Sequence, residues 1–127
     1  MPTVLVIEDD HDTRVALREL LEVDGFTVLS AANASEGYKL LEKMQSPVVV
    51  LLDQNMPLAN GEDFMAWKRQ NKRLENVPVI VMSAVANRLT QLGASEYIKK
   101  PIKHYLLTRA IRKHAPANHW TPGHIAG

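Results

Sequence analysis

The run Val48-Val-Val-Leu-Leu-Asp53-Gln-Asn-Met-Pro57 joins five consecutive apolar residues to a lone aspartate. Its length and its β-branched valines indicate a strand, and the lack of polar alternation is typical of a strand covered on both faces of a parallel sheet. Similar short apolar runs occur at four other places: Val4–Ile7, Thr27–Leu29, Val79–Met82 and the weaker Tyr97–Ile98. The sequence therefore predicts five buried strands.

Segments with helical spacing of apolar residues lie between or after these runs. Their apolar positions are Leu17, Leu20 and Leu21, then Leu40, Leu41 and Met44, then Phe64 and Trp67, and finally Leu107, Ala110 and Ile111. The alternation argues for right-handed crossovers and a doubly wound α/β fold with helices on both faces of a five-stranded parallel sheet. We expect the flavodoxin-like strand order 2-1-3-4-5, in which strands one and three are neighbours. We expect Phe64 and Trp67 to pack the third helix on the sheet. Between Met82 and Tyr97 there is room for only about two helical turns, so the fourth helix is expected to be shortened.

Composition limits the classes of partner. The chain has 127 residues, 46% of them hydrophobic, which is enough for one compact domain. The formal net charge of +1 gives no electrostatic reason to expect direct nucleic-acid binding or an anionic membrane. No apolar run approaches bilayer length, and the absence of cysteine fits a reducing compartment, so we expect a soluble cytoplasmic protein.

The C-terminal end differs in composition from the rest. Residues 115–127 contain two prolines and two glycines and show no periodicity, which indicates a flexible tail or a truncated linker. Residues 1–114 are accordingly the predicted domain.

Polar residues follow four of the predicted strands. These are Glu8-Asp9-Asp10 after the first, Asp53 after the third, Ser83 after the fourth and Lys99-Lys100-Pro101 after the fifth. In an open α/β sheet, ligands bind outside the carboxyl ends of the strands, so a parallel sheet would bring all of these residues to one edge.

Three carboxylates at that edge, those of Glu8, Asp9 and Asp53, would repel one another unless a cation lay between them. Carboxylates, a backbone carbonyl and waters suit Mg²⁺, which commonly also binds phosphate oxygens. Asp53 stands alone and is the preferred nucleophile towards phosphorus, with Lys100 to neutralise charge and Ser83 to donate a hydroxyl. Taken singly, Asp53 could be a turn residue and the acid pair a helix cap.

The motifs occur together and in a fixed order. The chain contains Val-Ile-Glu8-Asp9-Asp10, Val-Leu-Leu-Asp53-Gln-Asn-Met-Pro57, Asn60-Gly61, Val-Met-Ser83-Ala84, Gly93-Ala94 and Tyr97-Ile-Lys-Lys100-Pro101. This joint pattern resembles the CheY-like receiver domain of two-component response regulators, from about Val4 to about His114.

The resemblance implies a role for each matching position. Asp53 would be the phosphoacceptor and a metal ligand. The other expected roles are Mg²⁺ binding by Glu8, Asp9 and the Asn55 backbone carbonyl, phosphoryl contact by Ser83 and Lys100, and a conformational switch at Tyr97. Asp10 replaces Glu8 in the acid pair if the register shifts by one residue. The Lys100–Pro101 peptide bond is expected to be cis.

The resemblance also implies partners. The phosphoryl donor would be a sensor histidine kinase or a histidine phosphotransfer protein, and the chain would catalyse only its own phosphorylation and dephosphorylation. Its output would go through an unknown partner protein or a missing output domain, with a phosphorylation-dependent dimer as a further state. The shortened fourth helix belongs to the usual output surface, so we expect the chain to depart from the family there.

Two rival functions share some of these features. Haloacid-dehalogenase-like phosphatases also form an aspartyl phosphate, but they place a second aspartate two residues after the nucleophile, where this chain has Asn55. A phosphate-independent receiver-like interaction module would normally have lost the acid pair, Asp53 or Lys100, and this chain keeps all of them. The interaction module is therefore the alternative to a phosphorylation switch.

Overall fold

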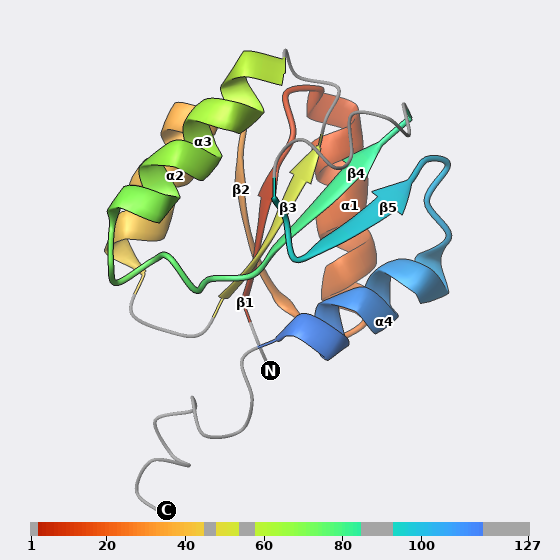
Figure 1. The fold of residues 1–127 in the computed structure, drawn as a ribbon. Coiled ribbons are helices and arrows are strands. Elements are labelled where there is room, and N and C mark those ends of the chain that lie inside the picture. Colours follow the sequence, from red (N-terminus) through yellow and green to blue (C-terminus); the bar gives the residue numbers. More distant parts are fainter. Residues whose placement is uncertain (1–2, 45–47, 54–57, 85–92, 116–127) are drawn as a thin grey trace, which may run out of the picture.

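The structure is a computed structural model that describes residues 3–44, 48–53, 58–84 and 93–115. Within these ranges the elements are β1 (Thr3–Ile7), α1 (His11–Val23), β2 (Thr27–Ala31), α2 (Ala34–Lys43), β3 (Val48–Asp53), α3 (Leu58–Gln70), β4 (Val79–Ser83), β5 (Glu96–Lys99) and α4 (His104–His114). The strands form one parallel sheet in the order β2-β1-β3-β4-β5 (Figure 1). This order confirms the predicted fold class. The expected short helix between β4 and β5 falls on residues 85–92, which lie outside the described ranges.

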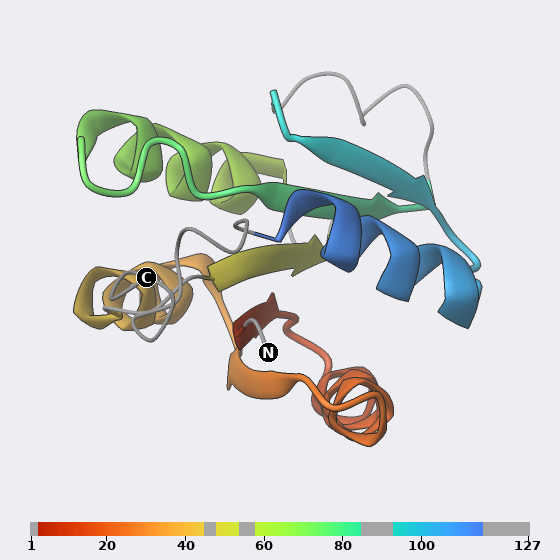
Figure 2. The same ribbon diagram turned by 90° about the horizontal axis from the view of Figure 1, so that it is seen from below.

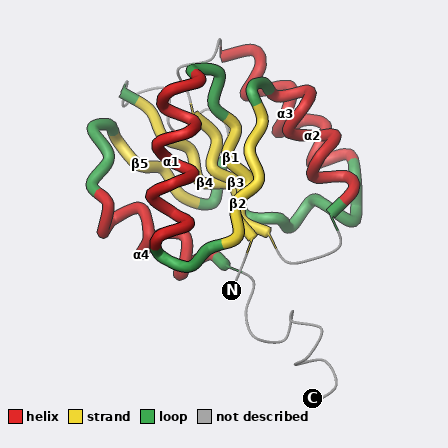
Figure 3. The backbone as a smooth tube through the Cα atoms, turned by 180° about the vertical axis from the view of Figure 1, so that it is seen from behind, coloured by secondary structure: helices red, strands yellow, loops and turns green. Residues whose placement is uncertain are grey.

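Helices cover both faces of the sheet. The pair α2 and α3 lies on one face, and α1 and α4 lie on the other (Figures 2 and 3). Alternate residues of β1 enter different cores, with Leu5 and Ile7 in the cluster on the α2–α3 side and Val4 and Val6 in the cluster on the α1–α4 side. Two-sided burial therefore explains the uninterrupted apolar runs of β1, β3 and β4. The prediction of five buried strands is wrong for the edge strands β2 and β5, which keep exposed residues such as Leu29, because an edge strand is covered less completely. None of the helices in the described ranges has the length and apolar character needed to cross a bilayer.

Local signals set both ends of α1. The Asp10 side chain caps the first turn, and the helix ends where Gly25 adopts a positive φ of 94°. The Gly25 N–H donates to the Glu22 carbonyl at 3.0 Å, and the Asp24 N–H donates to the Leu21 carbonyl at 3.1 Å. A left-handed residue after the last turn favours glycine, so the chain turns into β2 at this position.

The prediction for α3 is right for one aromatic residue and wrong for the other. Phe64 is fully buried in the core on the α2–α3 side, whereas Trp67 is 36% exposed. The Trp67 ring lies against Tyr38 of α2, with ring centroids 5.7 Å apart. Because α2 packs beside α3, the position three residues after Phe64 faces the seam between the two helices instead of the sheet.

Gly37 of α2 lies close against Ile7 of β1. A Cβ built at Gly37 would lie 2.5 Å from Ile7 Cδ1 and 2.8 Å from Ile7 Cγ1. Ile7 is fully buried, and it directly precedes Glu8 in the chain. The missing side chain therefore lets α2 pack against β1, the strand that the acid residues follow.

We expect Gly37→Ala to lower the free energy of unfolding by about 1 kcal/mol. Overpacking a core costs about 1–3 kcal/mol, which outweighs the gain of about 1 kcal/mol from replacing a helical glycine. Urea denaturation monitored by circular dichroism measures the change, and Ser35→Ala at an exposed site of the same helix is the control. A Gly37→Ala variant as stable as the wild type would show that Ile7 moves aside without cost.

Candidate functional site

Residues at the carboxyl ends of neighbouring strands meet at one edge of the sheet. Asp53 is the last residue of β3, and its Cα pairs in register with Met82 of β4. On the other side Ile7 pairs with Leu52, so the next residues, Glu8 and Asp53, follow at the same level. The ends of β1, β3 and β4 thus lie at one edge of the sheet, as predicted.

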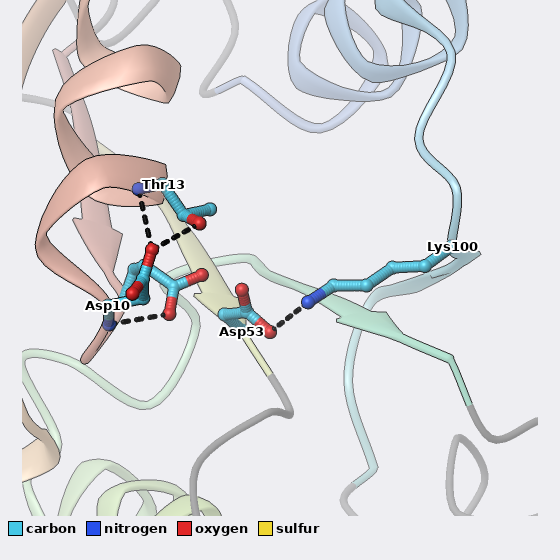
Figure 4. A network of polar contacts seen from close by, with 5 residues as sticks. Asp10, Thr13, Asp53 and Lys100 are labelled. Atoms are coloured by element: carbon cyan, nitrogen blue, oxygen red, sulfur yellow. Dashed lines mark hydrogen bonds and ion pairs between the residues drawn. The ribbon is translucent and has the colours of Figure 1, made fainter.

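Asp53 and Lys100 form a close ion pair at this edge. Asp53 is fully buried, and Lys100 Nζ lies 2.6 Å from its Oδ1 atom (Figure 4). The Lys100 backbone N–H donates to the Ser83 carbonyl at 2.8 Å, and the Lys100–Pro101 peptide bond is cis, as expected. A charge-assisted hydrogen bond is stronger than one between neutral groups, so the partly exposed ammonium group of Lys100 is held on the buried carboxylate.

Glu8 is buried, and the two oxygens of its carboxylate differ in their hydrogen bonding. The Asp10 backbone N–H donates to Glu8 Oε2 at 3.0 Å, whereas Glu8 Oε1 has no hydrogen-bond partner among the described residues. A buried carboxylate oxygen without a partner is costly, and a cation is one way to satisfy it. The exposed Asp9 follows directly, so two carboxylates are available for a metal.

These residues fit Mg²⁺ in donor chemistry. No three acidic or histidine side chains of the described ranges form a ready-made metal cluster, so the expected trio of Glu8, Asp9 and Asp53 is not preassembled. Mg²⁺ needs no such cluster, because it typically takes one or two carboxylates and fills its other positions with water and phosphate oxygens. Glu8 and Asp9 would hold the ion beside Asp53. The predicted carbonyl ligand, Asn55, lies outside the described residues.

The side chain of Asp10 caps the first turn of α1. Its Oδ2 atom accepts hydrogen bonds from the backbone N–H of Thr13 at 2.9 Å and from the Thr13 hydroxyl at 2.6 Å (Figure 4). These two bonds hold the pKa of the Asp10 carboxyl below its usual value. Since this carboxylate caps α1, the geometry favours the register in which Glu8 and Asp9 form the acid pair.

A matched pair of variants tests that register. We expect Asp9→Asn to weaken Mg²⁺ binding by more than about 100-fold, beyond the usual effect of losing an outer-shell partner. Asp10→Asn should weaken it by only about threefold through lost long-range attraction, because asparagine caps a helix as well as aspartate. Isothermal titration calorimetry measures both affinities. The opposite ranking would place the metal on Asp10.

Ser83 and Tyr97 lie on the neighbouring strands β4 and β5. Ser83 ends β4 and is buried, and it pairs in register with Lys99 of β5. Tyr97 is partly buried against the core on the α2–α3 side, and its hydroxyl accepts a hydrogen bond from the Ala94 N–H at 3.0 Å. The phosphoryl contact of Ser83 and the switch role of Tyr97 stay predictions.

A groove of about 450 Å³ gives access to the ion pair. Asp53 and Lys100 line it together with Thr13. Its walls are otherwise apolar: Ala16, Leu17, Leu20, Met82, Pro101 and Ile102. Sequence reasoning missed this groove, because its lining comes from four segments far apart in the chain.

Sequence reasoning also missed a contribution from the first turn of α1. Arg14 Nη1 donates to the Glu8 carbonyl at 2.8 Å. The signal was present in the spacing, since Arg14 follows the helix cap Asp10 by one turn and so faces back towards the end of β1.

The fold and the residues at its edge define a receiver-type signalling domain. The sequence matches the family described as the response regulator receiver domain over residues 4–112. The chain therefore belongs to the response regulator receiver domain family of two-component systems.

Curated relatives include longer proteins. The chain is 33% identical over 126 residues to the transcriptional regulatory protein CpxR of Escherichia coli strain K12, in an alignment that covers 95% of this chain and 52% of that protein. The chain thus spans about half the length of this curated relative.

Solved structures share the fold. The signal receiver domain of a signal transduction histidine kinase from Syntrophus aciditrophicus superposes with a TM-score of 0.80 at 24% identity, covering 90% of this chain and 89% of that one. The response regulator TrrA from Thermotoga maritima, in complex with Mg²⁺-BeF, gives a TM-score of 0.76 at 25% identity, covering 90% and 99%.

Proposed function

We propose that this chain is a phosphorylation-activated switch that accepts a phosphoryl group on Asp53 in a Mg²⁺-dependent reaction. The donor is a phosphohistidine of a sensor histidine kinase or of a histidine phosphotransfer protein. The observation that carries the proposal is the 2.6 Å contact between Lys100 Nζ and the buried Asp53 carboxylate. This contact stands at the strand ends beside an acid residue with an unsatisfied oxygen.

The chemistry follows from the positions of the groups. One Asp53 oxygen attacks phosphorus, the new P–O bond forms as the P–N bond to the donor histidine breaks, and the electron pair leaves with the imidazole. Lys100 neutralises charge on the transferred oxygens, and the Ser83 hydroxyl donates to one of them. Bound Mg²⁺ would supply further positive charge to the same oxygens. TrrA, the relative with Mg²⁺-BeF, supports the metal.

The groove beside Asp53 suits the approach of the donor. Its apolar walls come from α1, the end of β4 and the residues after Lys100. A helix of the donor that packs an apolar face on these walls would bring its histidine to the carboxylate and exclude water from the reaction. The chain acts only on its own phosphorylation state and has no separate substrate.

The signal passes on through a change in the surface of the domain, which alters its affinity for a partner. Moving a two-state equilibrium from about 1:99 to 99:1 takes about 5.5 kcal/mol, and new contacts of the phosphoryl group with Lys100 and Ser83 would contribute to it. Tyr97 would reposition with Ser83. The switch then regulates a partner protein or an output domain in the cytoplasm, and phosphorylation could pair two copies of the chain.

The test is intact-protein mass spectrometry after incubation with a small acyl phosphate. We expect one phosphoryl adduct with Mg²⁺ present and none when a chelator removes the ion. Peptide mapping after borohydride trapping should place the adduct on Asp53. A protein that takes up no phosphoryl group under any condition would instead support the phosphate-independent interaction module.

A further inference from the structure

Arg14 makes a contact that the reaction described above leaves unused. It lies in the first turn of α1 and is partly buried. Its Nη1 atom donates to the backbone carbonyl of Glu8 at 2.8 Å, and its Nη2 atom lies 3.3 Å from His11 Nδ1. The guanidinium group is therefore held between the start of α1 and the end of β1.

Glu8 is fixed at three atoms, and Arg14 supplies one of the three contacts. The Glu8 N–H donates to the Ala31 carbonyl of β2 at 3.0 Å, which continues the sheet beyond β1. The Asp10 N–H holds Oε2 at 3.0 Å, and Arg14 holds the carbonyl at 2.8 Å. The atom left over is the buried Oε1, which has no hydrogen-bond partner among the described residues.

We propose that Arg14 is a positioning residue that fixes Glu8 for the metal ion. This inference rests on the proposed function, since it takes Glu8 and Asp9 as the residues that bind Mg²⁺. Mg²⁺ demands near-ideal octahedral geometry, so a ligand that can rotate away weakens binding. The guanidinium is a cation and does not ligate the metal. It acts by holding the peptide unit between Glu8 and Asp9 through the Glu8 carbonyl.

Because Arg14 is positively charged, the direction in which its removal changes Mg²⁺ affinity distinguishes a positioning role from a purely electrostatic one. A guanidinium close to the acid pair repels a divalent cation, so its removal should tighten Mg²⁺ binding if only electrostatics mattered. A positioning role predicts the reverse, a weaker affinity after removal. Ca²⁺ accepts more flexible coordination, so the same change should cost Ca²⁺ less than Mg²⁺.

Arg14→Met in the full chain tests the proposal, with Arg18→Met as the matched control. Arg18 lies on the same helix, is exposed, and pairs only weakly with Glu22 at 3.4 Å. Calorimetric titration with MgCl₂ should show about tenfold weaker binding for Arg14→Met, the lower end of the range for lost outer-shell partners, and a smaller loss with CaCl₂. Arg18→Met should bind Mg²⁺ as the wild type does or slightly more tightly.

The possible failures are distinguishable. Equal or tighter Mg²⁺ binding by Arg14→Met, with a binding wild type, would overturn the positioning role and leave the phosphoacceptor function intact. A wild type that binds no Mg²⁺ would overturn the positioning role together with the metal dependence of the proposed function. Where circular dichroism shows Arg14→Met to be unfolded, Arg14→Lys decides. That variant keeps the charge and should still bind more weakly, and unchanged affinity would overturn the proposal.

Discussion

Asp53→Asn is expected to take up no phosphoryl group under conditions in which the wild-type protein takes up one. The amide has nearly the size of the carboxylate and can keep a contact with Lys100, but it lacks the anionic oxygen that attacks phosphorus. The remaining acids of the site, Glu8 and Asp9, are expected to be engaged with Mg²⁺. Intact-protein mass spectrometry with an acyl phosphate and Mg²⁺ measures the loss.

Asp63→Asn is the matched control for this result. Asp63 is an exposed acid on α3 and should leave the adduct unchanged. An adduct that persists in Asp53→Asn would move the acceptor to another carboxylate and contradict the assignment.

Lys100→Met is expected to lower the free energy of unfolding by about 3 kcal/mol. Breaking a buried ion pair by removing one partner costs about 3–5 kcal/mol, because the other charge stays in a low dielectric. We take the lower end because the Lys100 side chain is 20% exposed and water screens part of the interaction. Urea denaturation at neutral pH without added divalent cation measures the change.

A double-mutant cycle separates the ion pair from lost packing. In the Asp53→Asn background the same Lys100→Met change should cost only about 1 kcal/mol, since no buried charge is left behind. Lys99→Met, at the exposed neighbouring position, should change stability by less than about 0.5 kcal/mol. Equal costs of Lys100→Met in both backgrounds would show that the lysine stem, and not its charge, stabilises the fold.

Much of the fold could be predicted because its signals are local. Each strand is an apolar run of a few residues, and the lack of alternation correctly indicates burial on both faces for β1, β3 and β4 but not for the edge strands β2 and β5. Crossover rules then leave only a few strand orders for such a chain, and the observed order is β2-β1-β3-β4-β5. The chemistry at the edge was predictable for the same reason. Asp53 is the last residue of β3 and Lys100 directly follows β5, and the strands of a parallel sheet end on one side.

Other features depend on contacts between segments far apart in the chain. The exposure of Trp67 follows from α2 lying beside α3, and the groove at Asp53 needs α1 next to the residues after β5. Neither pattern appears in the spacing of one helix, because a residue's environment is set by what packs against its element.

The acid residues Glu8, Asp9 and Asp10 also combine a feature that the sequence shows with one that depends on the tertiary structure. Their number and their place after β1 were readable from the chain, since residue type and strand end are local properties. Only the tertiary structure separated their roles. Asp10 turns to cap α1, Glu8 is buried with one oxygen to spare, and Arg14 reaches back to hold the Glu8 carbonyl. Hydrogen bonds depend on distance and direction in space, and these are settled only when α1 packs against the end of the sheet.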